Sequence, residues 1–107
     1  MTQAMQSQIN SIVSQLVTHY KPEKIILFGS AARGDSTVDS DLDLFIVKSG
    51  VEKLGGPDRY REVAKFLPSE TAVDALVYTP YEMRKRVYLK DPFIETILKE
   101  GVELYAA

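Results

Sequence analysis

The stretch "LFGSAARGDSTVDSDLDLFIV", Leu27–Val47, places a glycine–serine turn, an arginine and four aspartates between two apolar runs. The first run, "KIILF" at Lys24–Phe28, is β-branched and aromatic and stops at Gly29, which predicts a buried strand. The second run, "LDLFIV" at Leu42–Val47, is continuously apolar in its later part, which predicts a central strand. The charged residues between them therefore either decorate a surface loop or are held in position by the two strands.

The rest of the sequence predicts helices around a small sheet. Thr79 has the position of an N-cap, Pro80 follows at the first helical position and Glu82 can close a capping box. The other expected elements are a helix from about Ala4 to His19, a helix from about Asp58 to Leu67, a strand at Thr71–Tyr78, helices from Pro80 to about Lys90 and from Pro92 to Gly101, and a short edge strand at 102–105. This order predicts an α/β fold with helices packed against the sheet.

The composition sets limits on the class of protein. A length of 107 residues predicts a single domain spanning 1–107, and 45% hydrophobic with 26% charged residues is typical of a globular protein. The formal net charge of −2 gives no broad electrostatic surface for nucleic acid. Without cysteine, disulfides and thiolate metal sites are excluded, which fits a reducing compartment. With no apparent signal peptide or membrane span, we expect a cytoplasmic protein with no membrane partner.

Asp41 and Asp43 indicate a metal site. Side chains alternate across a strand, so the two carboxylates point to the same side, with α-carbons roughly 6.5 Å apart. Carboxylates held that close repel each other unless a cation lies between them. Oxygen ligands of this kind suit Mg²⁺, which commonly takes one or two protein carboxylates and completes its shell with water and substrate phosphates.

Asp74 is the candidate third acid. It is surrounded in sequence by Val73, Ala75, Leu76 and Val77, where an ionised carboxylate is costly without a partner. If its strand lies beside the Leu42–Val47 strand, all three acids can converge on one metal cluster.

The turn at Gly29-Ser30 is a candidate phosphate site. Glycine lets a phosphate approach the backbone closely, and free amides at the start of a short helix attract anions. Ser30 adds a hydroxyl, and Arg33 offers either a positive fork to phosphate oxygens or a surface ion pair. A phosphate-binding turn followed by a metal-binding strand describes a site for a metal–nucleotide complex.

Each motif also has a plainer interpretation. A glycine–serine turn alone is usually only a turn, and an Asp-x-Asp alone is more often a solvated edge, so it is their combination at this spacing that favours a functional site. Asp35, Asp39 and Ser40 are expected to form or cap the loop, and His19 to favour a helix C-terminus. We expect a solvated helix face at 84–86, and packing in the core or against a partner for Tyr78, Tyr81 and Tyr88; helix packing is expected for Met83, Val87, Phe93, Ile97 and Leu98.

The motif resembles a known family. Gly29-Ser30, ten intervening residues and then Asp41-Leu42-Asp43 resemble the signature of the nucleotidyltransferase superfamily that includes DNA polymerase beta. The stretch "GSAARGDSTVDSDLDL" at 29–44 is similar to the minimal nucleotidyltransferases, the MNT antitoxins often paired with HEPN-domain partners in toxin–antitoxin modules. The resemblance covers most of the chain, from the Ile25 strand to the Asp74 strand, and implies a mixed β-sheet of the nucleotidyltransferase fold.

The resemblance also implies an activity. Such proteins transfer a nucleoside monophosphate from a nucleotide triphosphate to an acceptor hydroxyl, so Asp41 and Asp43 would bind two Mg²⁺ ions. Asp74 would bind the catalytic metal and help to activate the acceptor. For MNT antitoxins the implied reaction is AMP transfer from ATP to the HEPN toxin, and the choice of ATP rests on resemblance alone.

Two other functions stay open at this point. The chain has no room for a second domain that binds nucleic acid or a small acceptor, which favours a partner protein as the source of the acceptor. The first alternative is a non-catalytic binding module that neutralises its partner by occlusion. The second is a small-molecule nucleotidyltransferase that builds its acceptor pocket between the subunits of an oligomer.

Overall fold

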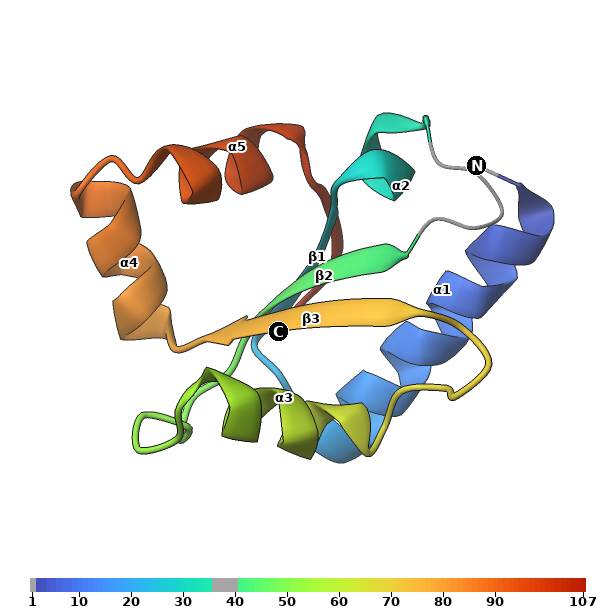
Figure 1. Ribbon diagram of the computed structural model, residues 1–107, viewed down its shortest axis with the longest axis horizontal. Coiled ribbons are helices and arrows are strands. Elements are labelled where there is room, and N and C mark those ends of the chain that lie inside the picture. Colours follow the sequence, from blue (N-terminus) through green and yellow to red (C-terminus); the bar gives the residue numbers. More distant parts are fainter. Residues whose placement is uncertain (1, 36–40) are drawn as a thin grey trace.

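The structure is a computed structural model that describes residues 2–35 and 41–107, so the predictions for Asp39 and Ser40 lie outside the described residues. Within these ranges the strands form one mixed sheet in the order β3-β2-β1-β4 (Figure 1). Its strands are β1 Lys24–Phe28, β2 Leu42–Val47, β3 Val73–Tyr78 and β4 Val102–Ala106. β1 runs antiparallel to both β2 and β4, whereas β2 and β3 are parallel. The predicted α/β fold with a mixed sheet is confirmed.

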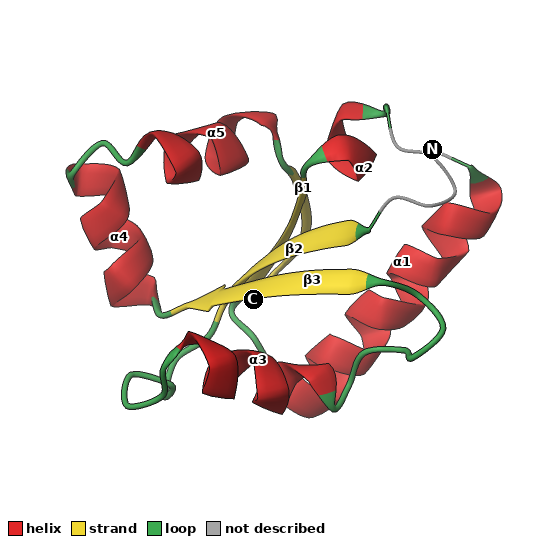
Figure 2. Cartoon of the chain, in the orientation of Figure 1, coloured by secondary structure: helices red, strands yellow, loops and turns green. Residues whose placement is uncertain are grey.

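The longer helices follow the predicted order with shifted ends, and a short helix between β1 and β2 is added to that order (Figure 2). They are α1 Gln3–Gln15, α2 Ser30–Arg33, α3 Gly56–Ala64, α4 Pro80–Tyr88 and α5 Pro92–Glu100, with a π-helical segment at Leu16–Tyr20. The predicted capping box of α4 is present, because the Glu82 backbone N–H donates to Thr79 Oγ1 at 3.1 Å and Thr79 N–H donates to Glu82 Oε1 at 2.9 Å. The first predicted helix differs, since its last turn widens into the π-helical segment. Lys21 then ends it in the left-handed region at φ 59° and donates its N–H to the Leu16 carbonyl.

The sheet separates two apolar layers. On one face, Ile25, Leu27 and Leu44 pack against α1 and the side of α3 that carries Val63. On the other face, Ile26 and Phe45 pack against Ile94 and Ile97 of α5. In Figure 1, α3 lies below the strands, α5 lies above them, and α1 slopes down along their right side. Strands β2 and β3 therefore place alternate side chains in two different surroundings, and the acids lie on the α5 face.

A partly buried ion pair joins α3 to α4. Arg59 is 8% exposed and makes a bidentate contact with Glu82, at 2.6 Å from Nη1 to Oε1 and 3.0 Å from Nη2 to Oε2. It also donates to the carbonyls of Leu54 and Val77. The pKa of Glu82 is lowered to about 2, chiefly by the hydrogen bond from Arg59. This network fixes the crossover helix of the parallel β2–β3 unit to the helix that follows β3.

The expectation of helix packing holds for only part of α4 and α5. Ile97 is buried and Met83 is partly buried, whereas Val87, Phe93 and Leu98 are 43%, 49% and 40% exposed. The reason is that α5 buries only Ile94 and Ile97, one stripe of the helix, and α4 buries no residue at all. Tyr78 of β3 packs on Phe45, as expected. Tyr81 and Tyr88 of α4 are exposed and do not pack in the core.

None of the helices described in residues 2–35 and 41–107 is long and apolar enough to span a membrane.

Candidate functional site

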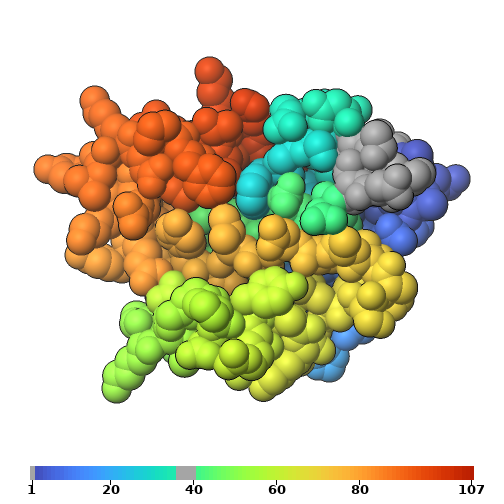
Figure 3. All heavy atoms as spheres, viewed as in Figure 1, coloured from blue at the N-terminus to red at the C-terminus, as the bar shows by residue number. Residues whose placement is uncertain are grey.

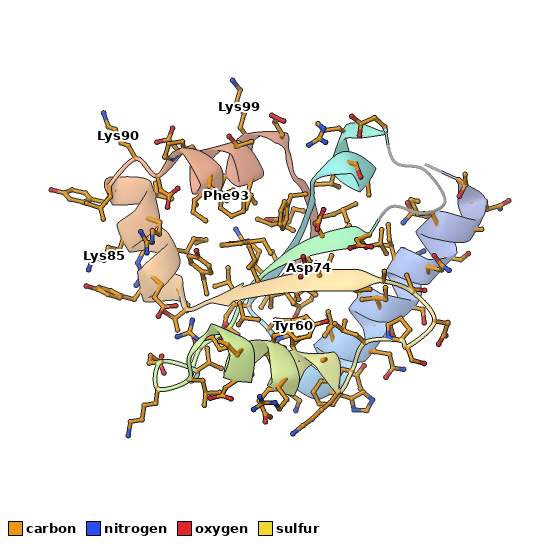
Figure 4. The ribbon with its side chains drawn as sticks, in the orientation of Figure 1. Tyr60, Asp74, Lys85, Lys90, Phe93 and Lys99 are labelled. Carbon is orange, nitrogen blue, oxygen red and sulfur yellow. The ribbon has the colours of Figure 1, made fainter. Side chains whose placement is uncertain are left out.

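The parallel pairing of β2 and β3 brings two of the predicted acids together. Asp43 and Asp74 are direct register partners, and the alternation of the strands puts both on the face that α5 covers in part. Asp41 precedes Asp43 by two residues and so lies on the same side, just before β2 begins. Figure 4 shows Asp74 on β3, on the side of the strand that faces α5. The condition set by the sequence, that the Asp74 strand lies beside the Leu42–Val47 strand, is met.

The carboxylate of Asp43 lies near other charged groups. Its pKa is raised from its ordinary value, first by burial, then by the negative charges of Asp74 and Asp41, while Arg33 opposes these effects. A raised pKa means that the ionised form of Asp43 is unfavourable in the folded chain unless a positive charge balances it. The negative charges of Asp74 and Asp41 thus act on Asp43, and a divalent cation would relieve that repulsion.

Gly29 lies directly against Asp43. Its backbone has φ 76° and ψ −154°, a combination that only glycine adopts freely. A Cβ placed on Gly29 would overlap Asp43 Oδ2, well inside van der Waals contact. The register explains this, because Phe28, the residue before Gly29, is the partner of Asp43 across β1 and β2. The turn predicted to hold phosphate and the acid predicted to hold metal are therefore in contact.

Ser30 and Arg33 lie on α2, the short helix that follows this turn. Ser30 is its first residue and is partly exposed, directly after Gly29. Arg33 Nε donates to Asp35 Oδ2 at 3.3 Å, in an exposed ion pair. The sequence left Arg33 open between a phosphate contact and a surface pair; the structure shows the pair. Because Arg33 also acts on the pKa of Asp43, its charge is within reach of the acids.

The carboxylate oxygens of the three acids are ligands of the kind that Mg²⁺ prefers. Within the part of the chain that the structure describes, no group of three or more Asp, Glu, His or Cys side chains is arranged to hold one metal ion by itself. Mg²⁺ does not require such a cage, since it is usually held by one or two carboxylates plus water and substrate phosphates. The adjacent Asp43 and Asp74, with Asp41 beside them, meet that requirement, and their role as metal ligands stays a prediction.

A cavity of about 570 Å³ adjoins the acids on the outer side of β3. Asp41 and Asp74 line it together with Tyr60, Ser69 and Thr71. Tyr60 donates its hydroxyl to the Val73 carbonyl at 3.3 Å and lies on α3, facing β3 in Figure 4. Figure 3 shows this part of β3 at the molecular surface above α3. The carboxylates are therefore accessible to a second reactant from the edge of the sheet.

Sequence reasoning missed a pair of aromatic side chains, Phe28 and Phe93, beside the glycine turn. Phe28 and Phe93 meet edge to face with ring centroids 6.0 Å apart, and both line a cavity that includes Gly29. The exposure of Phe93 carries no signal in the sequence, because its spacing within α5 is that of a packing residue. Phe28 has a weak signal, as the residue immediately before the glycine turn.

Comparison with known proteins gives a consistent result. Residues 7–104 match the family model described as the nucleotidyltransferase domain. The fold is similar to the crystal structure of a candidate nucleotidyltransferase from Sulfolobus solfataricus, with a TM-score of 0.65 and 26% sequence identity over 99% of this chain and 89% of that one. Among curated protein sequences, none matches.

Proposed function

Because this chain belongs to the nucleotidyltransferase domain family, we propose that it transfers a nucleoside monophosphate from a Mg²⁺–nucleoside triphosphate complex to a hydroxyl group. The observation that carries the proposal is the contact between Gly29 and Asp43, with Asp74 as the register partner of Asp43. A turn open to phosphate and a pair of carboxylates open to a divalent cation are the two parts that such a substrate needs.

The residues divide the work as follows. Gly29 and Ser30 would hold the triphosphate, and Asp41, Asp43 and Asp74 would hold the divalent ions. When bound, the ions would neutralise the charge that develops on the leaving pyrophosphate. The acceptor oxygen attacks the α-phosphorus, the bond to pyrophosphate breaks, and Asp74 takes the hydroxyl proton. The position of Asp74 on the open cavity at the edge of β3 supports this role.

We further propose that the nucleotide is ATP and that the acceptor is a hydroxyl of a HEPN-type toxin, with this chain as the antitoxin. The motif at Gly29–Asp43 supports this through its resemblance to MNT antitoxins. The surface of α4 is compatible with a protein partner, because none of its residues is buried, and Tyr81 and Tyr88 are 64% and 84% exposed. Large exposed aromatic side chains gathered on one helix are typical of interaction surfaces.

The test is transfer of label from [α-³²P]ATP to the partner, with Mg²⁺ present. Asp41→Asn, Asp43→Asn and Asp74→Asn should each abolish labelling, since each removes a carboxylate charge with little change in shape. Asp58→Asn is the matched control, because Asp58 is an exposed acid on α3 whose ion pair with Arg61 is remote from the turn. Labelling that survives in the three site variants would refute the proposed site.

Neutralisation of the partner separates the occluding module from the enzyme. If Asp43→Asn still neutralises the toxin as well as the unchanged chain does, occlusion explains the effect and transfer does not. Transfer to small hydroxyl compounds without any protein partner would instead favour the oligomeric small-molecule enzyme.

A further inference from the structure

The cavity between α2 and α5 continues directly from the glycine turn. It has a volume of about 260 Å³ and is lined by Phe28, Gly29, Arg33, Phe93, Thr96 and Glu100 among others. Gly29 also belongs to the turn that is proposed to hold the triphosphate, and Arg33 ends the short helix that follows it. A nucleotide whose phosphates lie at Gly29 therefore has this cavity within reach.

Phe93 lies outside the buried stripe of α5. It stands in the first turn of α5 and is 49% exposed, whereas Ile94 and Ile97 of the same helix are 0% and 2% exposed. In Figure 4 its side chain points from α5 toward the sheet face that carries Asp74. The ring packs against that of Phe28, with the two ring planes 89° apart. The ring is therefore held in place and still offers surface to a ligand.

We propose that Phe93, supported by Phe28, is the surface on which the base of the bound nucleotide stacks. This inference rests on the proposed function, since it extends the triphosphate site by one subsite. The size agrees, because pockets that enclose a drug-sized ligand are usually about 300–1,000 Å³, so a cavity of about 260 Å³ holds one part of a nucleotide. A flat aromatic base is the part that stacks on an aromatic ring.

The polar rim of the cavity agrees with a nucleobase. Thr96 and Glu100 lie one turn apart on α5 and line the same cavity. A hydroxyl and a carboxylate on the rim can accept hydrogen bonds from ring or amino N–H groups. Stacking itself discriminates by ring size, so purine nucleotides should bind more tightly than pyrimidine nucleotides.

The experiment measures the affinity of the full chain for two ligands by calorimetry in Mg²⁺. ATP has a base and inorganic tripolyphosphate has none. Phe93→Leu keeps an apolar side chain against Phe28 but removes the flat ring, and Phe93→Tyr keeps the ring. Tyr88→Ala is the control, because Tyr88 is 84% exposed on α4 and does not line the cavity.

We expect Phe93→Leu to weaken ATP binding by about 5- to 150-fold, the range that stacking of one base supplies, and to leave tripolyphosphate binding unchanged. The preference for ATP over UTP should fall in the same variant. Phe93→Tyr and Tyr88→Ala should bind both ligands as the unchanged chain does.

Two results would overturn the inference, and they differ from failure of the proposed function. If Phe93→Leu binds ATP as tightly as the unchanged chain, the base does not stack on Phe93. If it loses ATP and tripolyphosphate affinity equally, Phe93 acts on the phosphate turn and not on the base. If the unchanged chain binds neither ligand, the proposed function fails, and the base subsite fails with it.

Discussion

Replacing Gly29 with alanine is the most direct test of the contact between the turn and the acid. The change adds one methyl group, which would overlap Asp43 Oδ2, and it places a Cβ at φ 76° and ψ −154°. Both effects act on the two parts of the proposed site at once. We expect Gly29→Ala to lower stability and to abolish binding of Mg²⁺–nucleotide.

The magnitude follows from two contributions. A residue with a Cβ in this backbone region costs about 1–3 kcal/mol. The overlap adds less than a buried clash, because the carboxylate is the end of a side chain that can rotate away, so we expect about 1 kcal/mol from this source. The free energy of unfolding should fall by about 2–4 kcal/mol, and Asp43 should move out of the position where it faces Asp74.

Gly34→Ala provides the matched control. Gly34 follows the last residue of α2 and has φ 82°, but nothing lies within 4 Å of the position of its added Cβ. It should therefore cost only the left-handed backbone, about 1–2 kcal/mol, and keep nucleotide affinity within about threefold. Urea unfolding followed by far-UV circular dichroism and tyrosine fluorescence gives the stabilities, since the chain has 6 tyrosines and no tryptophan.

A double-mutant cycle isolates the contact itself. In a background with Asp43→Ala there is no carboxylate to overlap, so Gly29→Ala should cost about 1 kcal/mol less than in the unchanged chain. Equal costs in the two backgrounds would show that Gly29 is required by its backbone alone. Full nucleotide affinity in Gly29→Ala would refute the reasoning on the site.

Three other changes have defined outcomes. Glu82→Gln should remove stability that is present above pH 5 and is lost as the pH falls from about 4.5 toward 2. The pKa of about 2 corresponds to about 3 kcal/mol, which solvent around a side chain 36% exposed reduces to about 1–2 kcal/mol. Unfolding measured as a function of pH checks this, with Glu62→Gln as the control, because Glu62 belongs to an exposed ion pair whose loss should change the free energy of unfolding by less than about 0.5 kcal/mol. Asp43→Asn should leave the metal-free chain at least as stable as before at pH 7, since the raised pKa of Asp43 makes its charge unfavourable, and thermal unfolding should show stabilisation by Mg²⁺–ATP only in the unchanged chain. Tyr20→Phe should not lower the urea midpoint, because the buried Tyr20 hydroxyl has no hydrogen-bond partner among the described residues; a loss above about 1 kcal/mol would contradict this.

The parts of the fold that sequence reasoning predicted are those set by local chemistry. The ends of β1 and β2 agree with the prediction, because Gly29 ends one apolar run and Asp41 precedes the other. The capping box at Thr79 was predictable for the same reason, since its hydrogen bonds join residues three apart. Membership of the nucleotidyltransferase superfamily was predictable from the spacing of Gly29-Ser30 and the Asp-x-Asp motif. The match of residues 7–104 to the nucleotidyltransferase domain confirms it.

The parts that it did not predict depend on contacts between distant residues. The register that pairs Asp43 with Asp74 joins strands on either side of a crossover, and no local pattern specifies it. Arg59 lies in the polar stretch "GPDRYRE", which is typical of a solvated helix face. In the structure it is buried and pairs with Glu82, which lies 23 residues away in the sequence. The exposure of Phe93 likewise depends on how α5 lies over the sheet, which periodicity within the helix does not determine.

The parallel pairing of β2 with β3 also makes the complete site depend on a contact across a crossover connection. A chain that has formed only the β1–β2 hairpin has the glycine turn and Asp43 but lacks Asp74, because β3 arrives through a crossover and pairs with β2 alone. Nucleotide should therefore bind the complete native chain and no earlier species, and at one hundred times its dissociation constant it would add about 2.7 kcal/mol to the apparent stability. The cellular nucleotide pool would then govern how long this protein survives proteolysis as well as how fast it reacts.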